Sequence, residues 1–130
     1  MASYWFGHVH LVSHDPLKTA QFYEMAFDAK QGAVTSRPDG GVTVRLNIEG
    51  IIILIMSARD ESQSAEDSPK KRYGLEHFGL YTDNLDAAVA DLKAKGVRFV
   101  EEIRVAPSGA KIAFLMAPDN VMIELVESSS

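Results

Sequence analysis

The chain has 130 residues, the usual size of one compact domain, and its 46% hydrophobic and 24% charged residues are typical of an ordinary globular protein. Cysteine is absent, which excludes disulfides and thiolate metal sites and restricts any metal ligands to His, carboxylate, carbonyl or water. The formal net charge of −5 disfavours a nucleic-acid partner. The apolar run at residues 51–56 is too short to cross a bilayer, and no basic segment leads into a hydrophobic stretch at the N-terminus. We therefore expect a cytoplasmic protein without a membrane partner.

The first half of the chain has the pattern of a strand, a helix and three further strands. The first strand begins at His8, and the helix follows with Asp15 as a suitable N-terminal cap and Pro16 in its first turn. The helical stretch has periodic apolar residues, which are Leu17, Ala20, Phe22, Tyr23 and Phe27. Three β-like runs follow, at roughly residues 30–36, 41–49 and 51–57. These elements predict a βαβββ module at about residues 5–57.

The second half repeats this pattern after a polar segment. That segment, at about residues 58–74, is rich in Ser, Asp, Glu, Lys and Arg and predicts a solvated linker or loop. The next strand begins at His77, and its helix is capped by Asp83 or Asn84 and ends at Gly96. Three β-like runs complete a second module at about residues 75–128, namely roughly residues 97–105, 109–116 and 121–127. We expect both modules to belong to one domain, residues 1–130.

The repeat aligns two histidines with each other and a carboxylate with a leucine. A gapless alignment of the first strands of the two halves pairs His8 with His77, and a second one, of their last strands, makes Leu54 the counterpart of Glu124. Side chains alternate between the two faces of a strand. With the intervening apolar residues packed against the helices, His8, His77 and Glu124 take the opposite face.

The sequence resembles the vicinal oxygen chelate superfamily, which includes glyoxalase I, methylmalonyl-CoA epimerase, extradiol dioxygenases, and fosfomycin- and bleomycin-resistance proteins. The resemblance covers nearly the whole chain, and its last part is similar to the family ending DPDGxxxEL, with Asn120 in place of the usual Gly. It implies an α+β fold of two βαβββ modules, related by a pseudo-twofold axis, that form an open cupped sheet around a metal, often in a homodimer. The residues that carry it are His8, Asp15, Phe22, Tyr23, the segment 74–80 and the segment 117–125.

The resemblance implies that His8, His77 and Glu124 hold one divalent metal ion. Two imidazoles and one carboxylate suit Fe, Mn, Co, Ni or Zn and leave positions open for substrate oxygens. The alternative is that each histidine is a hydrogen-bonded strand residue in a metal-free binding protein. His10 is predicted to point to the same face, as a substrate contact or general base, or else as a polar wall residue.

Several other side chains are predicted to line the cup. The apolar ones suggest a partly apolar small-molecule substrate, although the same residues could pack against the other half or another subunit. Arg45 and Lys111 lie on the strands before the last strand of each half and could receive an anionic group, or be solvated surface residues. The apolar lining residues are Ile52, Leu54, Met56, Tyr81 and Met122.

Three kinds of function fit this pattern. In the glyoxalase I pattern the position of Leu54 carries a second carboxylate, so an isomerase built on this chain needs Glu124, His10 or another group as its base. Extradiol ring-cleaving dioxygenases use two His and one carboxylate, but they usually carry an acid–base Tyr where this chain has Phe114. A drug- or metabolite-binding protein of the bleomycin-resistance kind needs no metal. The hypothesis that we favour is a metal-dependent lyase or isomerase acting on a small substrate that chelates the metal through neighbouring oxygens.

Overall fold

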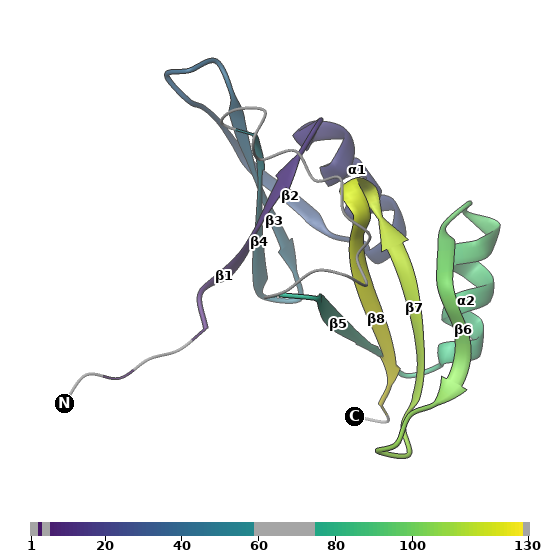
Figure 1. Ribbon diagram of the computed structural model, residues 1–130. Helices are drawn as coiled ribbons and strands as arrows, with labels where there is room; N and C mark the ends of the chain where they lie inside the picture. Colours follow the sequence, from purple (N-terminus) through teal and green to yellow (C-terminus); the bar gives the residue numbers. More distant parts are fainter. Residues whose placement is uncertain (1–2, 4–5, 59–74, 129–130) are drawn as a thin grey trace. The chain divides into compact units, whose positions relative to one another are not determined.

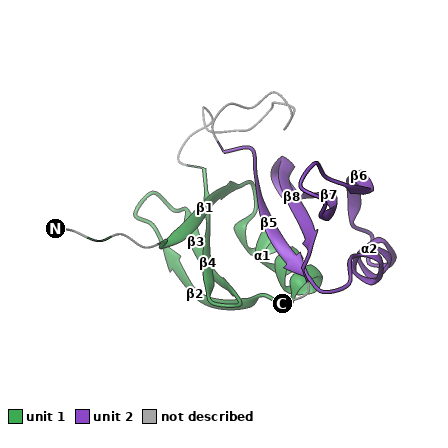
Figure 2. Ribbon diagram, turned by 90° about the horizontal axis from the view of Figure 1, so that it is seen from below, with its two compact units in different colours: residues 1–64 green, residues 65–130 purple. Residues whose placement is uncertain are grey.

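The computed structural model describes residue 3 and residues 6–58 and 75–128, in two compact units, residues 1–64 and 65–130 (Figure 2). The predicted linker at about residues 58–74 lies, apart from residue 58, outside the described residues. Unit 1 contains β1 (His8–Ser13), α1 (Pro16–Phe27), β2 (Lys30–Ser36), β3 (Val42–Ile48) and β4 (Ile51–Ser57). Unit 2 contains β5 (His77–Thr82), α2 (Leu85–Ala94), β6 (Arg98–Val105), β7 (Lys111–Ala117), the 3-10 turn η3 (Pro118–Asn120) and β8 (Val121–Glu127). The predicted α+β fold of two repeated βαβββ modules is confirmed.

Unit 1 is a four-stranded sheet with one helix packed on it. The strand order is β1-β4-β3-β2, with β1 parallel to β4 and the other pairs antiparallel (Figure 1). As expected, Asp15 caps α1, its carboxylate accepting a hydrogen bond from the Lys18 N–H at 3.2 Å. The core lies between α1 and one face of the sheet, and its most deeply buried side chains are Ala20, Tyr23, Val44, Leu46, Ile53 and Ile55. Leu17 does not join it and is 43% exposed.

Unit 2 repeats this construction. Its strand order is β5-β8-β7-β6, again with the first and last strands of the module parallel. Asn84 caps α2 by accepting a hydrogen bond from the Ala87 N–H at 3.0 Å, and Gly96 follows the helix with a left-handed φ of 87°. The core side chains between α2 and the sheet include Leu85, Leu92, Leu115, Ile123 and Leu125. Phe78 and Leu80 are the apolar residues of β5 that strand alternation assigns to the helix side, opposite His77, and they are only half-buried.

The turn before the last strand of each module requires a left-handed residue at equivalent positions. Gly50 has a φ of 88°, and Asn120, its counterpart in the repeat, has a φ of 58°. Asn is one of the few residues besides Gly that adopt this conformation readily. The replacement of the usual Gly by Asn120 therefore preserves the turn that leads into β8.

Within the described part of the chain, neither helix has the length and apolarity that crossing a bilayer requires.

Candidate metal centre

The central feature of unit 2 is a contact between His77 and Glu124. Gly79 of β5 is in register with Glu124 of β8, and His77 lies two residues before Gly79 on the same face of the sheet. The Nε2 atom of His77 lies 3.2 Å from Oε1 of Glu124. Both side chains are partly buried, with exposed fractions of 28% for His77 and 21% for Glu124. The repeat and the period of a strand predicted that these two side chains share a face, and the structure brings them together.

Neighbouring residues hold this pair in place. A Cβ atom added to Gly79 would lie 3.8 Å from Oε1 of Glu124, so the carboxylate extends over the glycine. On the other side, Phe114 of β7 is in register with Glu124 and makes an edge-to-face contact with the His77 ring, with 5.1 Å between ring centroids. Phe114 is only 7% exposed. The imidazole is therefore fixed between a carboxylate and a buried aromatic ring.

The second nitrogen of His77 also faces a carboxylate. Its Nδ1 atom lies 2.9 Å from Oε1 of Glu76. A neutral imidazole has a single N–H and can donate to only one of two carboxylates. The other nitrogen then directs a lone pair at an oxygen of like partial charge, an arrangement that a cation or a second proton between the two atoms makes favourable.

This donor set fits a divalent metal. With the proton on Nδ1 directed to Glu76, Nε2 of His77 and the carboxylate of Glu124 are left as ligands, and Glu76 orients the ring from behind as carboxylates do in many metal sites. An imidazole nitrogen and a carboxylate oxygen are suitable for Fe, Mn, Co, Ni or Zn. The sequence reasoning did not identify Glu76, although its position next to His77 was an available signal.

An apolar cluster borders the pair. Met122 is buried among Ile112 and Phe114, with Val100 and Val126 packed against them. Met122 is in register with His77, so this cluster lies on the same face of the sheet as the predicted ligands. Tyr81, on the same face, is 79% exposed. The predicted lining residues of unit 2 thus provide a buried apolar floor and one accessible phenol.

The corresponding face of unit 1 carries the other predicted residues. His8 and His10 project from β1 with their ring centroids 5.9 Å apart, in register with Ile52 and Leu54 of β4. Both histidines are exposed and Leu54 is half-buried. Arg45 of β3 is in register with Leu54 on its other side. Met56 is buried, with 6% exposure.

The three-ligand set remains a prediction. The structure places His77 and Glu124 together in unit 2, while His8 belongs to unit 1. No group of three or more His, Asp or Glu side chains suited to a metal is gathered among residues 6–58 and 75–128.

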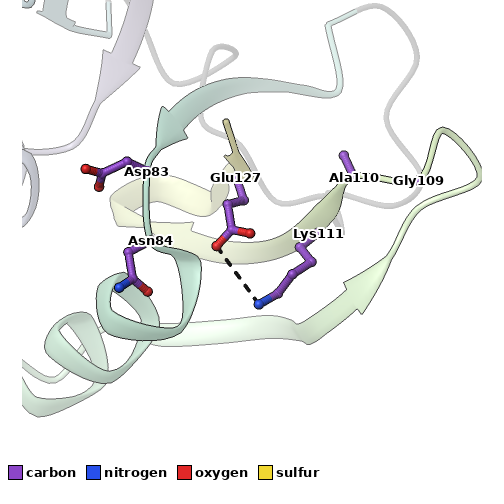
Figure 3. Close-up of a pocket in the computed structure, with 6 residues that line it drawn as sticks. All are labelled: Asp83, Asn84, Gly109, Ala110, Lys111 and Glu127. Atoms are coloured by element: carbon purple, nitrogen blue, oxygen red, sulfur yellow. Dashed lines mark ion pairs between the residues drawn. The ribbon is translucent and has the colours of Figure 1, made fainter. Parts of the chain in front are cut away.

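Lys111 is occupied by ion pairs. Its Nζ atom lies 2.6 Å from Oδ2 of Asp86. The same atom lies 4.0 Å from Oε2 of Glu127 (Figure 3). The hydrogen bond that Lys111 donates to the Asp86 carboxylate raises the pKa of Lys111 above its usual value. Glu127 also accepts a hydrogen bond from the Leu85 N–H at the start of α2, so this cluster lies on the helix side of the sheet. Lys111 and Glu127 line a pocket of about 600 Å³ together with Asp83, Asn84, Gly109 and Ala110.

Comparison with known proteins identifies the wider family. The model of the Glyoxalase/Bleomycin resistance protein/Dioxygenase superfamily matches residues 5–125. Human mitochondrial methylmalonyl-CoA epimerase is 30% identical over 128 residues, which cover 94% of this chain and 73% of that protein. Lactoylglutathione lyase of Schizosaccharomyces pombe is 27% identical over 143 residues, covering 98% of this chain and 46% of that protein.

Solved structures show the same fold at lower sequence identity. A glyoxalase family protein from Enterococcus faecalis superposes with a TM-score of 0.83 at 22% identity, covering 95% of this chain and 97% of that one. The fosfomycin resistance protein FosX of Listeria monocytogenes, in complex with Mn(II) and sulfate, gives a TM-score of 0.74 at 22% identity, covering 98% and 94% of the two chains. These two structures support the fold assignment.

Proposed function

Because the chain belongs to the Glyoxalase/Bleomycin resistance protein/Dioxygenase superfamily, we propose that it is a metal-dependent lyase or isomerase that acts on a small substrate through neighbouring oxygens of that substrate. The observation that carries this proposal is the contact of His77 Nε2 with the Glu124 carboxylate, while Nδ1 faces a second carboxylate. His77 and Glu124 bind the ion, and His8, the counterpart of His77 in the first module, is the third predicted ligand.

The proposed reaction class follows from the groups of the chain that can accept a proton from the substrate. A bound divalent metal stabilises negative charge on substrate oxygens, which makes a proton on the neighbouring carbon easier to remove. The base that removes it comes from the chain, and our candidates are the Glu124 carboxylate and the His10 imidazole. Leu54 has no proton-accepting group, so the counterpart of Glu124 in unit 1 cannot share this task.

Phe114 argues against ring cleavage. It lies in register with Glu124 and against the His77 ring, where it offers no hydroxyl for acid–base chemistry. A hydrocarbon ring at this position instead shields the imidazole from water. This favours proton transfer on a partly apolar substrate over oxygen chemistry.

The experiment that tests the reaction compares two probes. Protein loaded with Mn, Co, Ni or Zn is incubated with methylmalonyl-CoA or with lactoylglutathione in D₂O, and incorporation of deuterium at carbon is followed by NMR. Oxygen uptake is measured in parallel with catechol and Fe(II). Exchange that disappears in the Glu124→Gln variant supports the isomerase or lyase. Oxygen uptake without exchange would establish a dioxygenase, and metal-independent ligand binding with neither activity would establish a binding protein.

Assembly and location complete the proposal. Each four-stranded sheet ends in edge strands, and pairing or covering such edges is a common reason for association. We expect a cytoplasmic homodimer. Sedimentation at micromolar concentration tests the assembly, and a monomer there would refute the dimer without affecting the metal centre.

A further inference from the structure

Unit 2 supplies its own anionic oxygen at the centre of the candidate site. The row of residues across its sheet runs from Gly79 on β5 to Glu124 on β8 and Phe114 on β7. The glycine leaves space, the acid fills it, and the aromatic ring closes the other side. The carboxylate reaches His77 from this row.

Unit 1 has the opposite arrangement in the equivalent row. His10 on β1 takes the place of the glycine, Leu54 on β4 that of the acid, and Arg45 on β3 that of the phenylalanine. Residues in register on adjacent strands project from the same face, so Leu54 is flanked by an imidazole and a guanidinium. The two outer strands of this row lie about 10 Å apart, which is twice the spacing of adjacent strands. The long side chains of these strands can lean over Leu54 and contact a small ligand between them.

The strands that form this face carry no acidic side chain. The four strands of unit 1 contain neither Asp nor Glu, and their only ionisable side chains are those of His8, His10, Lys30 and Arg45. The whole chain nevertheless has a net charge of −5. The sheet of unit 1 is therefore basic within an acidic protein.

Arg45 is the residue of the row that is best placed to bind an anion. It is exposed, and its aliphatic stem lies beside Gly32, where an added Cβ atom would meet Cδ of Arg45 at 3.7 Å. Among the described residues, no acidic partner is found for its guanidinium. An arginine supported in this way, without a neighbouring carboxylate, is suited to bidentate binding of an external oxyanion.

We propose that the row His10–Leu54–Arg45 binds the anionic group of the substrate, a carboxylate or a phosphate, with Arg45 as the principal donor and Leu54 as an apolar floor. This inference rests on the proposed function in one respect, because it identifies the bound anion with the substrate of the proposed enzyme. The anionic oxygen that unit 2 carries in Glu124 is provided in unit 1 by the ligand. The substrate is accordingly an anion.

The test uses the full chain stripped of metal, so that anion binding is measured apart from the metal centre. Malonate, inorganic phosphate and the uncharged malonamide are titrated by calorimetry, and the Nε–H signal of Arg45 is followed by NMR. The variants are Arg45→Gln, Arg45→Lys, Leu54→Glu and the isosteric Leu54→Gln. Lys18→Gln, an exposed change on α1, is the matched control for loss of a positive charge.

We expect malonate or phosphate to bind and malonamide not to bind. Loss of a charge-assisted contact in Arg45→Gln should weaken the anion at least about tenfold, while Arg45→Lys retains part of the affinity and Lys18→Gln all of it. Leu54→Glu should abolish anion binding by placing a carboxylate between the two basic groups, and Leu54→Gln should weaken it much less. Equal binding of malonate and malonamide, no anion binding, or unchanged affinity in folded Arg45→Gln would overturn the inference. Metal binding without anion binding would refute the anion site and leave the metal centre standing. Anion binding without metal binding would refute the metal centre and leave the anion site standing.

Discussion

Replacement of Ile123 by alanine tests the register that places Glu124 on the face opposite the core. Ile123 precedes Glu124 on β8, is 0% exposed and packs on the helix side of unit 2. The substitution removes three carbon groups at about 0.8 kcal/mol each, and the residual cavity raises the expected loss in unfolding free energy to about 3–4 kcal/mol. For a chain of this length, that corresponds to a decrease in Tm of about 10–15 °C.

Urea unfolding followed by circular dichroism measures this loss. The matched control is Ile51→Ala, the same chemical change at a site that is 50% exposed, where we expect about 1 kcal/mol. Ile53, the counterpart of Ile123 in unit 1, is 2% exposed and should behave like Ile123. If Ile123→Ala destabilised the protein no more than Ile51→Ala, β8 would have the other register, and Glu124 would point into the core.

Three further variants test the surroundings of the site and the support of the fold. Glu76→Gln weakens the hydrogen bond that orients His77 and should reduce metal affinity about tenfold by calorimetry; unchanged affinity would show that Glu76 does not orient the ring. Ser13→Ala leaves the buried hydroxyl of Thr19 without its 2.6 Å partner and should cost about 1–3 kcal/mol in urea unfolding, whereas a neutral effect would contradict the buried contact. Because Arg37 lowers the pKa of Asp39 below 3.8, the stability that this pair contributes is present above pH 3.8 and lost as pH falls through the lowered value. The stability difference between wild type and Asp39→Asn should therefore shrink in acid, and a difference that grew would reverse this assignment.

The elements of the fold could be predicted because their signals are local. Asp15, Asn84 and Gly96 have the cap and helix-end positions that their side chains favour. The three strands that follow the helix in each module begin and end within two residues of the predicted limits. Leu17 is different, because helical periodicity does not specify which apolar residue at the edge of the stripe reaches the core.

The site could be predicted only in part. Strand alternation was sufficient to bring His77 and Glu124 to one face, because both are on adjacent strands of one unit. The ion pairs of Lys111 depend on where α2 lies against β7, and the contact of Phe114 with His77 depends on strand register and side-chain rotamers. The contrast between His10 and Gly79 was already available in the aligned halves. The sequence did not show which residues lie next to His10 and Gly79 in the sheet. The strand register shows that His10 lies beside Leu54 and Gly79 beside Glu124.

Metal titration of the stripped protein tests the central proposal most directly. Mn, Co, Ni and Zn are titrated by calorimetry into wild type, Glu124→Gln, His77→Gln and Glu102→Gln, the last being an exposed acid of the same unit. We predict one ion per chain in wild type and in Glu102→Gln, and affinity lower by at least about 100-fold in the other two, since loss of a direct ligand should exceed the effect of losing an outer-shell partner. Equal binding in all four proteins, or no binding of any metal by wild type, would contradict the assignment of His77 and Glu124 as metal ligands.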